Sequence, residues 1–150
     1  MPDWLANDWQ FTWSNGLKIA LTYVLTAIIG WQRESEEHNA GVRTFPIVGI
    51  ACCGYLLILG VHPDTGDQSR VLQGLITGIG FVGGGAIVKE GATVKGTATA
   101  ASIWNAGVIG ASVAMQHYGI AITLMLLNLF TLRALLPIKR KLDGIKSSGE

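Results

Sequence analysis

The stretch "GLITGIGFVGGGAIV", from Gly74 to Val88, contains the pattern G-x-G-x-x-G at Gly78, Gly80 and Gly83. This pattern is found in dinucleotide-binding loops, but small residues at short helical spacings also occur where membrane helices pack closely together. The two interpretations need different surroundings, so the neighbouring residues decide between them.

A dinucleotide-binding loop needs a strand before it, a helix after it and an acidic residue about 20 positions further on. The residue 20 positions after Gly83 is Ile103, which lies inside another apolar segment. The range 71–88 contains no charged residue, and its only polar side chains are Gln73 and Thr77. These surroundings favour a membrane helix over a nucleotide-binding loop.

In a membrane helix, the glycines predict a surface for contact with another helix. Gly74, Gly78 and Gly85 fall near one face, and Gly80 and Gly84 form a second pair. The segment 98–115 carries two matching rows of small residues: Ala106, Gly110 and Ala114, and Gly107 with Ala111. Because small residues let helix backbones approach closely in lipid, we expect the segments 71–88 and 98–115 to pack tightly.

The composition supports the same fold class for the whole chain. Only 14% of the 150 residues are charged, compared with roughly 25% in typical soluble domains. Apolar segments that approach the length of a bilayer-spanning helix follow one another through the chain. These segments are 17–31, 45–61, 71–88, 98–115 and 120–136. The sequence therefore predicts an all-α integral membrane protein with about five transmembrane helices in one domain, 17–136.

The basic residues predict the orientation of this domain, because they gather on the cytoplasmic side of membrane proteins. One side has only Lys18 and Arg70. The other side has nine basic residues: Arg33, Arg43, Lys89, Lys95, Arg133, Lys139, Arg140, Lys141 and Lys146. We expect the N-terminus outside, with residues 1–16 as an aromatic interfacial segment, and residues 137–150 as a basic cytoplasmic tail.

The cytoplasmic connectors offer two kinds of ligand site. Thr44 and Thr99 come where helices start, so they are expected to cap helix N-termini. Those N-termini, flanked by Arg43 and Lys95, suit an anion such as a phosphate or a lipid headgroup. Conversely, the carboxylates of Glu34, Glu37 and Glu90 suit Mg²⁺. A solvated charged loop without any specific ligand is the alternative to both.

Polar residues inside the apolar segments are few. Asn105 and Asn128 are expected to hydrogen-bond between helices. None of the five segments contains Asp or Glu, and the sequence has no nucleophile–base pair and no phosphate-binding lysine motif, so no enzymatic activity is expected. A net charge of +1 gives no indication of nucleic-acid binding.

Three blocks, "GWQRE…AGVRT", "DQSRVLQGLITGIGFVGGGAI" and "VKGTATAASIWNAGVIG", resemble the signature blocks of the MgtC/SapB family of bacterial membrane proteins. Gln32 stands where that family often has Glu, which removes one carboxylate from any metal site there. By position, the resemblance and the motif analysis assign functional roles to fourteen residues. They are Arg33, Glu34, Gly41, Arg43, Thr44, Asp67, Arg70, Gly78, Gly80, Gly83, Gly85, Thr99, Trp104 and Asn105.

The resemblance implies a multi-pass protein of the bacterial inner membrane that is linked to magnesium limitation and, in pathogens, to survival inside host cells. The chain is similar to the short branch that lacks a C-terminal soluble domain. Two functions remain open. The first is regulation through helix contacts with itself, as a homo-oligomer, or with another membrane complex. The second is transport of Mg²⁺ or another ion by a homo-oligomer. Because the segments lack ionisable lining residues, the sequence favours regulation.

Overall fold

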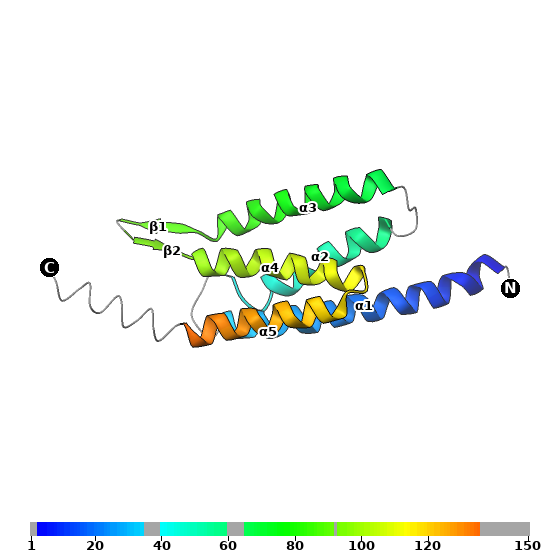
Figure 1. Cartoon of the computed structure of the whole chain (residues 1–150), viewed down its shortest axis with the longest axis horizontal. Coiled ribbons are helices and arrows are strands. Elements are labelled where there is room, and N and C mark those ends of the chain that lie inside the picture. The colour runs from blue at the N-terminus through cyan, green and yellow to red at the C-terminus, as the bar shows by residue number, and fades with distance from the viewer. Residues whose placement is uncertain (1–2, 35–39, 60–64, 92, 136–150) are drawn as a thin grey trace.

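The computed structural model describes residues 3–34, 40–59, 65–91 and 93–135 of the chain. These residues form five helices and one short hairpin (Figure 1). The elements are α1 (Asp3–Glu34), α2 (Thr44–Leu59), α3 (Thr65–Gly85), β1 (Val88–Glu90), β2 (Thr93–Lys95), α4 (Thr97–Ala114) and α5 (Tyr118–Ala134). The predicted all-α class and the order of five helical segments are confirmed.

The helix bounds follow the apolar segments most closely for α2, α4 and α5, which agree with the predicted ranges within two residues at each end. The other two helices extend further into polar sequence. α1 continues without a break to Asp3, and α3 begins at Thr65. Polar residues do not end a helix by themselves, and neither extension contains the proline that would. Hydropathy marks the apolar part of a helix and misses such extensions.

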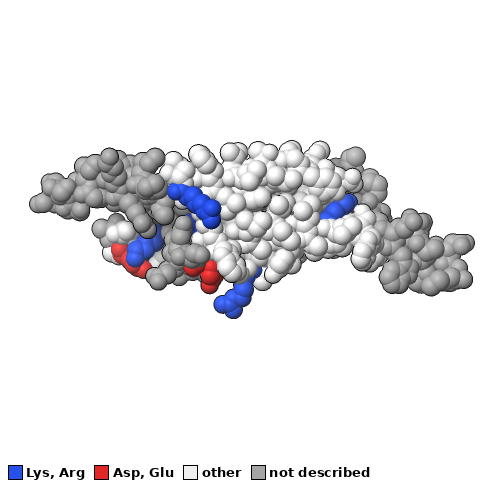
Figure 2. All heavy atoms as spheres, turned by 90° about the horizontal axis from the view of Figure 1, so that it is seen from below, with Lys and Arg blue, Asp and Glu red and all other residues white. Residues whose placement is uncertain are grey.

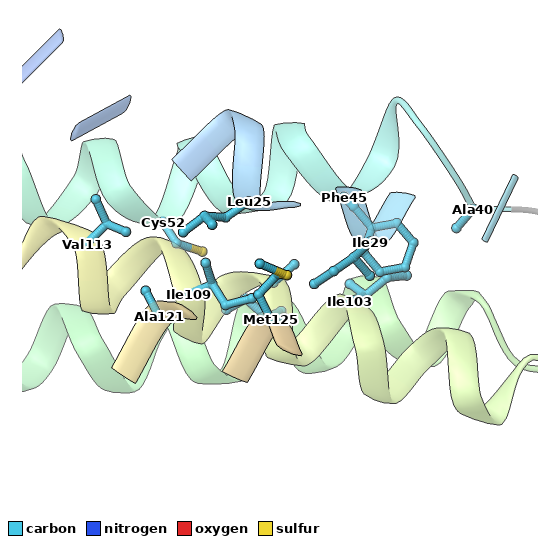
Figure 3. Close-up of a cluster of buried hydrophobic side chains, with 12 residues drawn as sticks. Leu25, Ile29, Ala40, Phe45, Cys52, Ile103, Ile109, Val113, Ala121 and Met125 are labelled. Carbon is cyan, nitrogen blue, oxygen red and sulfur yellow. The ribbon is translucent and has the colours of Figure 1, made fainter. Parts of the chain in front are cut away.

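α4 lies at the centre of the bundle and packs against each of the other helices (Figure 1). The side chains between these helices form one apolar core, which Figure 3 shows from close by. Its larger members are Leu25 and Ile29 from α1, Phe45 from α2, Ile103, Ile109 and Val113 from α4, and Met125 from α5. α3 contributes Ile79, and it contacts α4 and α2.

Close approach of α1, α2 and α4 depends on two glycines. A Cβ atom at Gly49 of α2 would lie 2.7 Å from Thr26 Cγ2 of α1. A Cβ atom at Gly110 of α4 would lie 3.0 Å from the carbonyl carbon of Gly49 and 3.2 Å from the backbone nitrogen of Cys53. The backbones of α2 and α4 therefore touch at a point where only glycine fits. The row of small residues that contains Gly110 was predicted to meet α3, but at this position it meets α2.

α3 packs against α4 as predicted, but most of its glycines do not form the contact. A Cβ atom would meet nothing within 4 Å at five of its glycines: Gly74, Gly78, Gly80, Gly84 and Gly85. Only Gly83 comes close to α4, where a Cβ atom would lie 3.1 Å from the Ala100 carbonyl oxygen. The face of α3 that meets α4 carries bulkier Leu75 and Ile79, and Ile79 packs where Gly107 of α4 leaves room. The small residue thus lies on α4 at this contact and the large one on α3.

The connector between α3 and α4 is an antiparallel hairpin, where the sequence predicts a charged loop. Val88 pairs with Lys95, and Glu90 pairs with Thr93. Gly91 has a φ of 60° between the strands, a conformation that L side chains seldom adopt. Glu90 and Lys95 lie on one face and form an ion pair at 2.6 Å, so the charges of this connector partly neutralise each other.

The face of the molecule in Figure 2 is uncharged over a broad middle region, and its charged side chains gather mainly at the left of the view. Many large apolar side chains of the bundle are exposed, among them Phe81, which is 85% exposed, and Ile58, Phe130 and Leu126. Within the described residues, no helix is both long enough and apolar enough to cross a membrane.

Candidate functional site

The end of α1 meets the start of α4 at a buried hydrogen bond between two of the predicted motif residues. Arg33 is only 3% exposed, and its Nη2 atom donates a hydrogen bond to Thr99 Oγ1 at 2.5 Å. The two residues are 66 positions apart in the chain. The fold therefore brings the first and the third signature blocks together at one point.

The backbone at both helix ends explains this placement. Arg33 lies in the last turn of α1, where the partial negative charge of the helix C-terminus stabilises a cation. α4 begins after Gly96, which has a φ of 86°. A Cβ atom at this position would collide with the Ala86 carbonyl oxygen, so the turn before α4 requires glycine. Thr99 follows in the first turn of α4 and is 2% exposed, so its hydroxyl group faces the protein interior.

The predicted capping roles of the two threonines are wrong. The N-cap residue of α4 is Gly96, which makes no side-chain capping bond, and the Thr99 hydroxyl group binds Arg33 instead. Thr44 is already the first helical residue of α2. The turn before α2 is held by the backbone, because the Phe45 N–H group donates to the Gly41 carbonyl group at 3.3 Å.

In the second part of the site, the end of α1 at Glu34 packs against the segment that begins at Gly41. Glu34 Oε2 accepts a hydrogen bond from the Val42 backbone N–H group at 3.1 Å. Gly41 makes this possible, because a side chain there would collide with the Glu34 carboxylate. Gly30, one turn earlier on α1, lies against the same segment: a Cβ atom there would be 2.9 Å from the Gly41 oxygen. Arg43 points outward and is exposed.

We call the group of Arg33, Glu34, Gly41, Val42 and Thr99 the α1–α4 junction. Gln32 lies next to it and is 8% exposed, yet neither polar atom of its amide has a hydrogen-bond partner among the described residues. Sequence reasoning noticed Gln32 only as a departure from the family pattern. Its burial depends on how the chain folds around α1, which local sequence does not reveal.

The carboxylates predicted as metal ligands do not come together in the described part of the chain. No three His, Cys, Asp or Glu side chains there lie close enough to hold a metal ion. The Glu34 carboxylate accepts a hydrogen bond from the Val42 N–H group, and the Glu90 carboxylate forms an ion pair with Lys95 at 2.6 Å on the hairpin. Glu37 lies outside the described residues. Binding of Mg²⁺ therefore stays a prediction without a structural site.

The D-x-x-R block lies on α3, away from the junction. Asp67 and Arg70 are in its first two turns, at the N-terminal end of α3. The junction lies near the hairpin, at the opposite end of the bundle (Figure 1). Arg70 is exposed. Of the four motif glycines Gly78, Gly80, Gly83 and Gly85, only Gly83 contacts α4 closely. The second block thus contributes no side chain to the junction.

The last motif residues lie between α4 and α5. Asn105 Nδ2 donates to the Leu124 carbonyl oxygen at 3.2 Å, and Ser102 Oγ donates to Asn128 Oδ1 at 3.1 Å. Both asparagines therefore make the predicted hydrogen bonds between helices. Trp104, which precedes Asn105 on α4, is 44% exposed.

Comparisons with known proteins agree with the resemblance noted from the signature blocks. The sequence model described as "MgtC family" matches residues 19–141. An uncharacterized protein of Synechocystis is 33% identical over 94 residues, which are 63% of this chain and 40% of that protein. Proteins named MgtC are 32% identical over 92 residues in Brucella abortus and 34% identical over 95 residues in Salmonella typhimurium.

The matched region covers only part of these relatives: 39% of the Brucella protein and 40% of the Salmonella protein. No solved structure matches this chain.

Proposed function

This chain belongs to the MgtC family, and on that premise we propose that it is a regulatory protein of the bacterial inner membrane. It acts in adaptation to low magnesium through helix contacts with itself or with a larger membrane complex. The cytoplasmic side holds the α1–α4 junction and the hairpin, and the opposite side holds the start of α3.

The surface of α1 supports the membrane location. Trp13 and Trp31 are 73% and 72% exposed, at two levels of one continuous helix. At 1.5 Å per residue they are about 27 Å apart, close to the ~30 Å thickness of a bilayer's hydrocarbon core. Tryptophan favours both membrane–water interfaces. The broad uncharged region in the middle of Figure 2 also suits a protein surrounded by lipid.

The observation that carries the regulatory proposal is that the polar motif residues Arg33 and Glu34 form hydrogen bonds within the bundle. Arg33 binds Thr99, and Glu34 binds the Val42 N–H group, so both side chains hold helix ends together. The interior beyond the junction is mostly apolar, with residues such as Ile103, and its buried polar residues Thr22 and Thr26 are uncharged. This arrangement favours a rigid bundle that presents apolar faces to neighbours over a protein that carries ions through its own centre.

Transport of Mg²⁺ or another ion by a homo-oligomer is the second candidate, and one observation favours it. A pocket of about 280 Å³ lies on the face shared by α4 and α5. Its lining includes the polar side chains of Ser102, Asn105, Asn128 and Thr131. If copies of the chain met at this face, these polar side chains would lie between the copies among apolar neighbours, where they could contact a passing ion.

A growth experiment tests the proposal. We expect a strain without this gene to grow poorly at limiting magnesium, and the wild-type gene to restore growth. Thr99→Val should fail to restore growth, because it removes the hydroxyl group that Arg33 binds, whereas Thr99→Ser should restore it. Lys95→Gln, which changes only an exposed ion pair, is the matched control and should behave like the wild type.

The same strains test the location. The protein should stay in the membrane pellet after washing with alkaline carbonate. Recovery in the supernatant would contradict the membrane proposal. Full growth of the deletion strain at limiting magnesium would contradict the role in adaptation.

A further inference from the structure

An open groove of about 600 Å³ runs between α2 and α3. Ligand-binding pockets typically measure about 300–1,000 Å³, so the groove has room for a small molecule or a single lipid chain. None of the motif assignments explains it. Its walls come from Val48, Cys52 and Tyr55 of α2 and from Arg70, Gly74 and Gly78 of α3, with further apolar residues of both helices.

The polar groups of the groove lie at one end. Tyr55 is near the C-terminal end of α2, and Arg70 is near the N-terminal end of α3. The end of α2 at Leu59 and the start of α3 at Thr65 are close in the sequence, so Tyr55 and Arg70 belong to the same end of the bundle. Val48 and Val82 line the other end. The groove is therefore apolar along its length and cationic at its mouth.

Two glycines of α3 leave room in the groove. A Cβ atom at Gly74 or Gly78 would meet nothing within 4 Å, so these positions open onto free space. From Arg70 to Val82 the lining of α3 extends about 18 Å at 1.5 Å per residue. One leaflet contributes about 15 Å, half of the ~30 Å hydrocarbon core. The groove thus has the length of an extended acyl chain in one leaflet.

We propose that this groove binds one acyl chain of an anionic phospholipid, with the phosphate group at Arg70. The proposal rests on the membrane location given above. The apolar walls match the acyl chain, and a guanidinium group suits a phosphate because it donates two parallel hydrogen bonds. Tyr55 supplies a further hydroxyl group at the same level.

A helix from a second copy of the chain fits the groove less well. A two-fold symmetric dimer within one membrane would place the same face of both copies against each other. Its two α3 helices would run in parallel, so both Arg70 guanidinium groups would approach the symmetry axis. Like charges repel each other there, whereas an anionic headgroup neutralises the charge.

Native mass spectrometry of the full chain in detergent tests the proposal, with phosphatidylglycerol and phosphatidylcholine added at equal concentration. The wild type should bind more phosphatidylglycerol. Arg70→Gln should lower the ratio of bound phosphatidylglycerol to bound phosphatidylcholine about fivefold. Gly78→Leu should abolish specific binding of both lipids, because the new side chain fills the groove. Gly80→Leu is the matched control: it lies on the same helix, outside the groove lining, in open space.

Three results would overturn the proposal: equal binding of both lipids by the wild type, undiminished binding by Gly78→Leu, or a wild-type dimer that Gly78→Leu dissolves. The last result would assign the groove to a second copy. Protection of the buried Cys53 thiol from labelling reports whether each variant is folded. If Gly78→Leu does not fold, Gly74→Leu takes its place in the experiment. A protein that stays in carbonate-washed membranes but binds neither lipid specifically refutes only this inference and leaves the proposed location intact.

Discussion

Replacement of Gly110 by alanine tests the closest helix contact in the bundle. The new Cβ atom would lie 3.0 Å from the Gly49 carbonyl carbon and 3.2 Å from the Cys53 nitrogen, and nearer still to the Gly49 oxygen. These atoms belong to the backbone of α2, so no side chain can rotate away. α2 and α4 must separate, which also loosens the packing of Ile109 and Val113 between them.

The expected loss of stability in Gly110→Ala follows from two opposing effects. Overpacking of a core costs about 1–3 kcal/mol, and we expect the upper end because the obstacle is backbone. Alanine recovers about 1 kcal/mol of helix propensity relative to glycine. The Gly110→Ala variant should therefore be about 2 kcal/mol less stable than the wild type, which corresponds to about a 30-fold larger population of opened molecules.

Labelling of the buried thiols by a maleimide in detergent measures this population, because Cys53 is 0% exposed and lies where α2 meets α4. The rate of Cys53 labelling should rise about 30-fold in Gly110→Ala when opening is fast and reversible. Gly80→Ala is the control, since a Cβ atom there meets nothing within 4 Å, and it should label no faster than the wild type. Equal rates in Gly110→Ala and the wild type would refute the contact between α2 and α4.

Three further predictions concern polar contacts, each measured as the free energy of unfolding in mixed micelles. A double-mutant cycle with Arg33→Gln and Thr99→Val should give a coupling of about 1.5–3 kcal/mol, because the bond is buried and charge-assisted; additive effects would contradict it. Asn105→Leu should cost about 1 kcal/mol by removing the bond to α5, and an unchanged stability would show that this bond contributes nothing. Glu90→Gln and Lys95→Gln should each cost less than about 1 kcal/mol, since both side chains are largely exposed; a larger loss would mean that the hairpin supports the bundle.

The helix order was predictable because each helix has an apolar stretch that hydropathy detects. The roles of Asn105 and Asn128 were predictable for a similar reason: a polar amide in an apolar segment needs a partner. The spacing of small residues predicted that α3 and α4 pack together, but it did not predict which residues of α3 make the contact. Spacing shows which small residues share a face, but the neighbouring helix decides which face is used, and Ile79 occupies the one that meets α4.

The site was predicted as a set of motif residues but not as an arrangement. Arg33 and Thr99 were both singled out, yet their separation of 66 positions hides the bond between them. Thr99 was expected to cap α4 because threonine favours that position, whereas Gly96 takes it with a positive φ. The buried amide of Gln32 and the groove between α2 and α3 depend on tertiary packing alone, which no local pattern reports.

Uptake of Mg²⁺ into liposomes tests the central claim, regulation without ion transport, most directly. The purified chain is reconstituted with a magnesium-sensitive dye inside the liposomes, and uptake is recorded with and without a membrane potential. Protection of Cys53 from labelling verifies that the protein is folded. We predict the same trace as for empty liposomes. Saturable Mg²⁺ entry that Asn105→Leu or Asn128→Leu reduces would contradict the regulatory account and assign the α4–α5 face to ion transport.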